Sequence, residues 1–358
     1  MTYRTVRINP ALPNKPRSSV LVIYTGGTLG MVYDRLNDQL VPFDFEGIID
    51  RVPEIRRLDF ELTVITLPTL IDSSNMKPDI WGELGRIIQK NYLEYDSFVI
   101  LHGTDTMAYT ASALSFLLEN LNKPVILTGA QLPIGVARTD ARENLITALE
   151  IAAAQQHGCP IVPEVCIYFN SLLLRGNRAK KKESVHFNAF HSENYPHLAM
   201  AGVSIEYNTP FIKSYEEDAA LRLHEHMDTG VMVLPLFPGI SPSVVDAVLT
   251  IPGLRGLVLE TFGAGNAPTD DWFLNSLKRA IERGVLIYNV SQCDGGRVTQ
   301  GRYQTSKVLQ QLGVVSGADI TVEAAITKLM FLLANEPDPT RLRQRLTDPI
   351  CGEMSVTE

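Results

Sequence analysis

Three short segments in the first third of the chain combine side chains that could bind and transform a small polar molecule. They read T-G-G-T-L-G at 25–30, D-S-S-N-M at 72–76 and H-G-T-D-T at 102–106. Together they offer hydroxyl groups, backbone amides made accessible by glycine, and carboxylates. Such groups suit a small zwitterionic ligand, because a large apolar ligand would need a pocket lined by apolar side chains.

The elements that must position these segments are apolar runs typical of buried strands. These runs are 19–24, 61–66, 98–101, 125–128 and 165–169. Helix-period segments separate some of them, including 80–88 behind Pro78. This alternation predicts an α/β fold with a doubly wound, mostly parallel sheet. Ligands bind outside the carboxyl ends of the strands in such a sheet, and the three segments follow three of those ends.

The third segment is expected to open a helix of roughly 105–120. The first N–H groups of a helix have no partner within it, so they can bind an anion. Thr104 and Asp105 would then lie beside a binding place for a substrate carboxylate.

The chain divides into two predicted domains. Residues 1–205 carry the three segments, 206–229 are polar and irregular like a linker, and the strand–helix alternation resumes in 230–358. A length of 358 residues agrees with two domains. We expect the second domain to be a smaller Rossmann-like α/β domain.

Composition excludes several classes of protein. The net charge of −8 and the lack of a dense Lys/Arg run argue against nucleic-acid binding. No apolar stretch approaches the ~20 residues of a membrane helix, and the first residues lack the apolar core of a signal peptide. The four cysteines form neither a C-x-x-C motif nor a disulfide framework. We therefore expect a cytoplasmic protein without membrane or nucleic-acid partners.

A nucleotide cofactor is the main rival interpretation of the glycines. The dinucleotide motif G-x-G-x-x-G requires glycine at alternate positions, whereas Gly26 and Gly27 are adjacent. No G-x-x-x-x-G-K-[ST] phosphate loop occurs in the sequence. His224-Glu225-His226 also lacks the context of a metal site. We expect no cofactor and no metal.

Taken together, the three segments resemble those of the L-asparaginase family, most closely its bacterial cytosolic (type I) branch. The resemblance covers nearly the whole chain from Val20. Four further segments are similar to the family: T-G-A-Q at 128–131, R-G-N-R at 175–178, F-G-A-G-N-A-P at 262–268 and G-A-D-I-T at 317–321.

The resemblance implies a different catalytic role for each of several hydroxyl, carboxylate and lysine side chains. Thr28 would be the nucleophile that forms an acyl-enzyme, helped by a neighbour because an unaided threonine hydroxyl is weakly acidic. Thr104, Asp105 and Lys181 would supply that help and handle the deacylating water. Lys180 and Lys182 flank Lys181, and a shift of one residue would move the assignment.

The resemblance also implies how substrate is held. Ser73 and Ser74 would hold the α-carboxylate of the substrate, and Asp105 its ammonium group. Donors near Thr104 would stabilise the tetrahedral oxyanion. The family carries a lid tyrosine shortly after the nucleophile, but Leu40 stands there in this chain. Tyr33 or Tyr303 are the substitutes we consider.

The implied reaction converts L-asparagine and water to L-aspartate and ammonia in a homodimer or homotetramer. Mixed asparaginase–glutaminase activity is a close alternative, because one methylene discriminates weakly. The amidase subunit of a tRNA-dependent amidotransferase uses the same motifs, but it would carry an added N-terminal domain for which the first 18 residues are too few. A silent amino-acid-binding protein is disfavoured by the presence of both Thr28 and the lysine cluster.

Regulation by a second asparagine is a further expectation to be tested. In this branch, the effector pocket uses a threonine before the catalytic lysine and an arginine before the F-G-A-G-N-type segment. Here Lys180 and Glu260 hold these positions, whereas Asn266 and Cys293 match the family. Since glutamate would repel the carboxylate of the effector, we predict hyperbolic kinetics.

Overall fold

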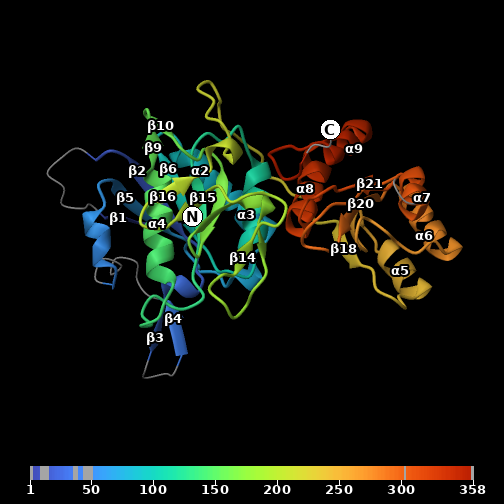
Figure 1. Ribbon diagram of the computed structural model, residues 1–358, viewed down its shortest axis with the longest axis horizontal. Helices are drawn as coiled ribbons and strands as arrows, with labels where there is room; N and C mark the ends of the chain where they lie inside the picture. Colours follow the sequence, from blue (N-terminus) through green and yellow to red (C-terminus); the bar gives the residue numbers. More distant parts are fainter. Residues whose placement is uncertain (1–2, 9–15, 35–38, 43–50, 302–303, 356–358) are drawn as a thin grey trace. The chain divides into compact units, whose positions relative to one another are not determined.

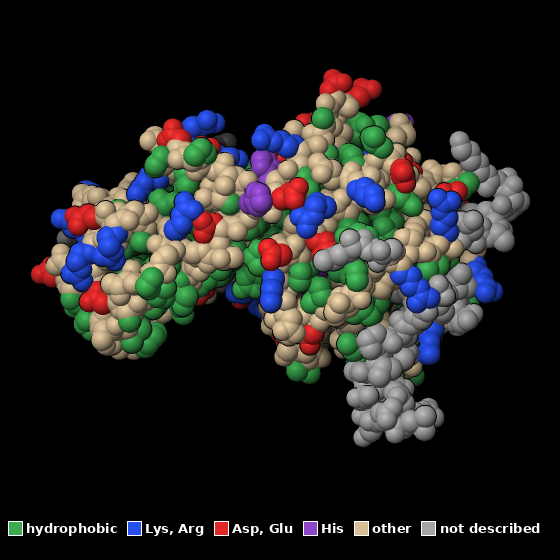
Figure 2. Space-filling model, turned by 180° about the vertical axis from the view of Figure 1, so that it is seen from behind, with side chains coloured by type: hydrophobic (Ala, Val, Ile, Leu, Met, Phe, Trp, Pro, Cys, Tyr) green, Lys and Arg blue, Asp and Glu red, His purple; other side chains and the backbone are tan. Residues whose placement is uncertain are grey.

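The computed structural model describes residues 3–8, 16–34, 39–42, 51–301 and 304–355. The chain forms two compact units, Met1–Leu223 and His224–Glu358, each with its own sheet and helices (Figure 1). On the face shown in Figure 2, the Lys and Arg side chains of the described residues are interspersed with Asp and Glu. This face therefore carries no extended area of a single charge among the described residues.

Among the described residues, the first unit builds a nine-stranded sheet with the order β1-β5-β2-β6-β8-β11-β12-β15-β16. The strands are β1 (Arg4–Ile8), β2 (Ser19–Tyr24), β5 (Glu61–Thr66), β6 (Ser97–Leu101), β8 (Val125–Thr128), β11 (Val165–Phe169), β12 (Leu172–Arg175), β15 (Ala199–Ala201) and β16 (Ile205–Tyr207). The five from β5 to β11 pair in parallel, and antiparallel strands flank them on both sides. The predicted α/β fold with a large, mostly parallel sheet is confirmed.

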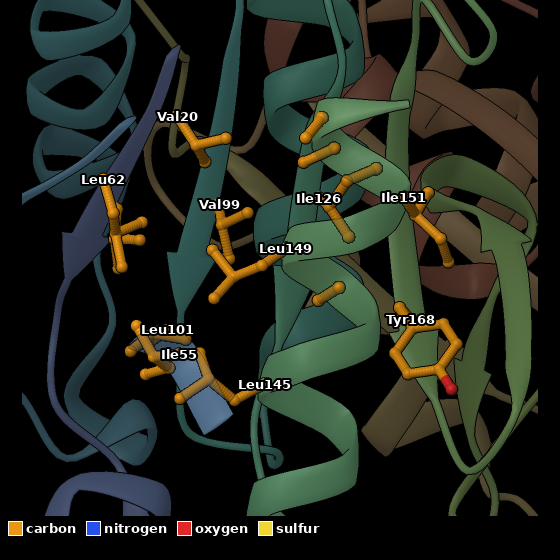
Figure 3. Packing of buried hydrophobic residues seen from close by; sticks show 14 of the residues in the cluster. Val20, Ile55, Leu62, Val99, Leu101, Ile126, Leu145, Leu149, Ile151 and Tyr168 are labelled. Atoms are coloured by element: carbon orange, nitrogen blue, oxygen red, sulfur yellow. The ribbon is translucent and has the colours of Figure 1, made fainter. Parts of the chain in front are cut away.

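The sheet is buried on both faces because its central strands are apolar at consecutive positions. Val20 and Val22 of β2 belong to the apolar cluster on one face, whereas Leu21 and Ile23 belong to the cluster on the other. Figure 3 shows the first cluster, to which strands and a helix both contribute side chains. Its labelled residues include Val20, Val99 and Ile126 from strands and Leu145 and Leu149 from α4 (Ala141–Ala153).

Two helices contribute to the cluster on the opposite face, α2 (Pro78–Asn91) and α3 (Met107–Leu117). Helix α2 begins at Pro78 and buries Leu84, Ile87 and Ile88, as its spacing predicts. The expected helix of roughly 105–120 is present as α3, but it is shorter at both ends, since it begins at Met107 and ends at Leu117. Thr104 and Asp105 lie in a turn before the helix.

Smaller elements complete the first unit. Two-stranded pairs are β3 (Met31–Asp34) with β4 (Gln39–Pro42), β7 (Leu118–Glu119) with β17 (Arg222–Leu223), β9 (Gln155–Gln156) with β10 (Cys159–Pro160), and β13 (Lys180–Lys181) with β14 (Phe190–His191). Short 3-10 helices are η1 (Thr28–Gly30), η3 (Pro53–Arg57), η4 (Ser73–Asn75), η5 (Gly176–Arg178) and η6 (Thr209–Phe211). Much of the stretch expected as a linker thus forms elements of the first unit, and the two units meet in sequence at Leu223–His224.

The second unit contains a parallel sheet with the order β18-β19-β20-β21. Its strands are β18 (Val231–Pro235), β19 (Gly256–Thr261), β20 (Leu286–Ser291) and β21 (Val315–Ser316). Its helices are α5 (Pro242–Leu249), α6 (Asp271–Glu282), α7 (Gln304–Leu312), α8 (Val322–Asn335) and α9 (Pro339–Thr347). This confirms the predicted smaller α/β domain. No helix in the described ranges is both long enough and apolar enough to cross a membrane.

A fully buried ion pair joins helix α8 to the segment after α9. Lys328 Nζ lies 2.7 Å from Glu353 Oε1, and both side chains are 0% exposed. The ammonium group also donates to the carbonyl oxygens of Leu346 and Asp348. Burial lowers the pKa of Lys328, while the lysine charge holds the pKa of Glu353 below its usual value despite burial. Each charge therefore depends on the other.

Candidate functional site

The order of the parallel strands locates a crevice. Strand β2 lies between β5 and β6, so the chain leaves β2 for one neighbour and later returns to its other side. In open α/β sheets, ligands bind at the carboxyl ends of the strands where the order reverses in this way. This point lies between the ends of β2 and β6, which lead into segments 25–30 and 102–106.

The loops after these two strands are joined through their backbones. Thr25 donates from both its N–H and its hydroxyl to the carbonyl oxygen of Leu101, at 3.1 and 2.9 Å. Gly27 has φ 85°, and a β-carbon there would lie 2.5 Å from the nitrogen of Gly103. A side chain at Gly27 would therefore separate the loops. Glycine at this position allows Thr28 to follow directly beside the second loop.

Thr28 begins helix η1 and is half-buried. Tyr24, the last residue of β2, stabilises this helix, because its hydroxyl donates to the carbonyl oxygen of Gly30 at 2.9 Å. Leu29 is buried in the apolar cluster. The turn is thus anchored on both sides, which fixes the backbone that carries the Thr28 hydroxyl.

Thr104, Asp105 and Lys181 form a connected cluster. The Nζ atom of Lys181 lies 2.8 Å from Thr104 Oγ1 and 2.6 Å from Asp105 Oδ1. The side chain of Lys181 is 18% exposed, whereas that of Asp105 is 64% exposed. A sheltered ammonium group therefore contacts one hydroxyl and one carboxylate that remains open to solvent.

The Nζ atom of Lys181, the middle one of three consecutive lysines, contacts this cluster. Successive side chains of a strand point to opposite faces. Lys182 instead pairs with Glu193 at the surface, with Nζ 2.6 Å from Oε1. Strand β13, which holds Lys180 and Lys181, pairs with β14, so the lysine run has a fixed backbone.

The segment before Lys181 is held by a buried ion pair. Arg175 Nε lies 2.6 Å from Glu164 Oε2, and both side chains are largely buried. Gly176 packs against α3, because a β-carbon there would lie 3.0 Å from the β-carbon of Ala111. These contacts fix the start of the segment that runs from Arg175 to Lys181.

Three buried side chains, linked by hydrogen bonds, fix the loop 102–106 that carries Thr104. His102 Nδ1 lies 2.7 Å from the carbonyl oxygen of Gly103, so this nitrogen carries the proton and donates. Its Nε2 then accepts from the hydroxyl of Thr110 at 2.9 Å, and Trp81 Nε1 donates to the same hydroxyl at 3.0 Å. Burial lowers the pKa of His102 to about 4. The imidazole is therefore neutral near pH 7.

The serines predicted to bind substrate lie in η4. Ser73 is 3% exposed and touches the second loop, since a β-carbon on Gly103 would lie 2.5 Å from its hydroxyl oxygen. Its carbonyl oxygen accepts from the hydroxyl of Thr106 at 2.7 Å. Ser74 is exposed, and its backbone N–H and hydroxyl donate to Asp72. These bonds hold the pKa of Asp72 below its usual value.

Two polar residues beside Thr104 were not singled out from the sequence. Gln131 contacts its hydroxyl at 3.2 Å, and His102 supports its loop. Both lie within segments that carry the family resemblance, T-G-A-Q and H-G-T-D-T, but residue type alone does not distinguish them from packing residues. Their roles depend on hydrogen-bond partners that are distant in sequence.

The structure describes only part of the two candidate lid tyrosines. Tyr303 lies outside the described residues. The backbone of Tyr33 belongs to β3 and pairs in register with Leu40 of β4, but its side chain is outside the described part.

The expected effector residues fall in both units. Lys180 lies in β13 of the first unit. The other three lie around the carboxyl ends of β19 and β20 in the second unit. There, Glu260 belongs to β19, the carbonyl oxygen of Asn266 accepts from Phe262, and the N–H of Cys293 donates to the Ser291 hydroxyl.

Within the described ranges, no group of three or more His, Cys, Asp or Glu side chains is arranged to hold a metal ion.

Comparison with known proteins covers both units. Residues 19–213 match the family described as Asparaginase, N-terminal, and residues 230–346 match the Glutaminase/Asparaginase C-terminal domain. L-asparaginase 1 of Escherichia coli K12 is 41% identical, with 95% of this chain and 98% of that protein covered.

Solved structures agree with these matches. L-asparaginase I from Vibrio cholerae has a TM-score of 0.85 and 39% identity, with 95% of this chain and 100% of that chain covered. The Probable Cytoplasmic L-asparaginase from Campylobacter jejuni has a TM-score of 0.76 and 26% identity, with 93% and 100% covered.

Proposed function

Because the chain belongs to the L-asparaginase family, and is thus an amidohydrolase acting on a linear amide, we propose that it hydrolyses L-asparagine through an acyl-enzyme on Thr28. In the first half-reaction, the Thr28 oxygen bonds to the side-chain amide carbon. The carbon–nitrogen bond then breaks, and ammonia leaves with the proton of the hydroxyl. In the second half-reaction, water attacks the ester, aspartate is released and Thr28 regains its proton.

The observation that carries this proposal is the contact of Lys181 with Thr104 and Asp105 next to the loop that holds Thr28. A weakly acidic hydroxyl and a water molecule both need a proton acceptor during these steps. In the resting structure, Lys181 Nζ donates to Thr104 Oγ1 at 2.8 Å; once the lysine has given up that proton, the same nitrogen can accept one over this short path. Asp105 keeps the lysine in place, with its oxygen 2.6 Å from Nζ.

We assign substrate binding to the groups at the carboxyl ends of β5 and β6. The exposed part of the Asp105 carboxylate faces solvent and would take the ammonium group of asparagine. Ser73 and Ser74 would take the α-carboxylate, for which the N–H and the hydroxyl of Ser74 would give up their bonds to Asp72. The buried position of Ser73 against Gly103 supports this assignment because it holds the serine segment close to Asp105 in the same crevice.

Thr28→Val tests the nucleophile. The change removes the attacking oxygen at nearly constant volume, so we expect the loss of at least about 1,000-fold in ammonia release from asparagine with an unchanged circular dichroism spectrum. Thr347→Val, at an exposed hydroxyl, is the matched control and should retain wild-type turnover. Turnover of the Thr28 variant within tenfold of wild type would refute the assignment.

The preference for asparagine over glutamine needs a direct comparison. The two amides differ by one methylene, which is worth about 1–3 kcal/mol in an apolar pocket. We propose asparagine as the preferred substrate because the relatives compared above carry that name. Initial rates of ammonia release from both amides, measured on the same preparation, decide between an asparaginase and a mixed asparaginase–glutaminase.

We further propose that a second asparagine does not activate the enzyme cooperatively. Lys180 and Glu260 stand where this branch has a threonine and an arginine, and glutamate repels a carboxylate. The rate should therefore rise hyperbolically from micromolar to millimolar asparagine. A Hill coefficient clearly above 1 would show that the effector pocket works despite these residues.

We propose a homodimer or homotetramer located in the cytoplasm, and the location alone agrees with the name of the Campylobacter jejuni neighbour. Light scattering of the purified protein measures its mass, and a monomer at micromolar concentration would refute the assembly. Fractionation of the producing cells would establish the location.

A further inference from the structure

Gln131 links Thr104 to the loop that follows Lys181. It comes three residues after β8, in Gly129-Ala130-Gln131. Its Oε1 atom lies 3.2 Å from Thr104 Oγ1, and its Nε2 atom lies 3.1 Å from the carbonyl oxygen of His186. The side chain is half-buried between these two partners.

The chemistry of the partners fixes the orientation of the Gln131 amide. A backbone carbonyl oxygen can only accept a hydrogen bond, so the NH₂ group must face His186. The amide oxygen must then face Thr104, and it can only accept. The hydrogen of the Thr104 hydroxyl is therefore directed toward Gln131.

This direction determines what Thr104 offers to Lys181. A hydroxyl has one hydrogen and two lone pairs. Because the hydrogen is bound to Gln131, the lone pairs remain to accept, and Lys181 Nζ donates to this oxygen from 2.8 Å. Without Gln131, the hydroxyl could rotate and present its hydrogen in place of a lone pair.

The backbone of Gln131 is held firmly enough to impose this direction. The N–H of Gln131 donates to both carboxylate oxygens of Asp140, at 3.1 and 2.9 Å, and the N–H of Leu132 donates to Oδ1 at 3.1 Å. Asn144 Nδ2 bonds both to Asp140 Oδ2 and to the carbonyl oxygen of Gly129, at 3.3 and 3.0 Å. Both ends of the residue are therefore fixed.

We propose that Gln131 is a positioning residue that orients the Thr104 hydroxyl so that its oxygen accepts from Lys181. This inference rests on the proposed function of Thr104 in turnover. Gln131 acts through Thr104 and contacts no substrate in this scheme. Its loss should therefore reduce kcat and leave KM nearly unchanged.

Gln131→Met is the main test because it keeps the length of the side chain and removes its polar atoms. We expect kcat for asparagine to fall about tenfold and KM to change less than about twofold, as for the loss of one oriented hydrogen bond. Gln131→Glu keeps an acceptor for Thr104, so it should lose less than the methionine variant. Gln156→Met, at an exposed glutamine, should match wild type.

A measurement in the Thr104→Val variant separates this inference from the proposed function. If Gln131 acts through Thr104, Gln131→Met should cause no further loss when added to Thr104→Val. A kcat within twofold of wild type for Gln131→Met, or equal losses in the methionine and glutamate variants, would overturn the positioning role. If Thr104→Val is still strongly impaired, the proposed function stands. A fully active Thr104→Val would overturn both.

Discussion

Acidification should destabilise the first unit through the buried imidazole of His102. The pKa of His102 is lowered to about 4 in the folded chain, whereas an exposed histidine titrates near 6.5. Between these values the unfolded chain binds a proton that the folded chain does not. The free energy of unfolding must therefore fall as the pH decreases through this window, and it is unaffected by His102 above it.

The size of the effect follows from the shift in pKa. A difference of about 2.5 pKa units corresponds to about 3 kcal/mol, at about 1.4 kcal/mol for each unit. That is a large fraction of the ~5–15 kcal/mol by which proteins are stable. Protonation would also turn Nε2 from an acceptor into a donor, so the hydrogen of the Thr110 hydroxyl would lose its acceptor.

Urea unfolding between pH 7 and pH 4 measures this effect. The chain has two tryptophans, Trp81 in α2 and Trp272 in α6, so Trp81 fluorescence reports on the first unit in a Trp272→Phe background. His102→Asn, which cannot titrate, should be less stable at pH 7 but should lose about 3 kcal/mol less than the parent on acidification. Parallel curves of unfolding free energy against pH would refute the reasoning.

Two further predictions concern lysines in different settings. Lys181→Met should lower kcat for ammonia release at least about 100-fold, as expected for a group that takes part in proton transfer. Lys182→Met should change kcat less than about twofold, because the ammonium group of Lys182 pairs with Glu193 at the surface. A larger loss for Lys182→Met than for Lys181→Met would assign the catalytic role to Lys182. Lys328→Met should lower the unfolding free energy of the second unit by about 3–5 kcal/mol, because the carboxylate of Glu353 then stays buried without a countercharge and keeps backbone donors, among them the N–H groups of Ile350 and Cys351. Lys278→Met removes one partner of an exposed ion pair, so it should change the unfolding free energy by less than about 1 kcal/mol. Equal effects of the two changes, measured by calorimetry, would contradict the larger cost expected for the buried pair.

The central strands could be predicted well because their signal is local. Strands β2 and β5 have the predicted bounds, since runs of apolar residues buried on both faces are continuous in sequence. Helix α3 was harder to delimit because it is buried nearly all round, which leaves no polar stripe to show its period. Helices α4 and α8 were not predicted at all, and they too bury most of their residues.

The site could be predicted only as a set of neighbouring loops. Family resemblance selected Lys181 from three adjacent lysines, and the contact of its Nζ atom with Thr104 is consistent with that selection. The positions of Gln131 and His102 relative to Thr104 could not be predicted, because they depend on the loops after β8 and β6 meeting in space. A single sequence carries no direct record of such contacts.

The glycines of the site have a consequence for how relatives are recognised. A β-carbon on each of three glycines would lie too close to a neighbouring atom. The distance would be 2.4 Å from Gly26 to Ile71 O, 2.5 Å from Gly103 to Ser73 Oγ and 2.3 Å from Gly129 to His102 O. None of these distances involves the Thr28 hydroxyl or the Lys181 amine, so the packing of the loops requires the glycines whether or not the chain turns over substrate. A descendant that had lost the Thr28 hydroxyl would retain them. Genome surveys that identify asparaginases by glycine-rich signatures will therefore also collect inactive paralogues, which only the hydroxyl and amine positions can separate from enzymes.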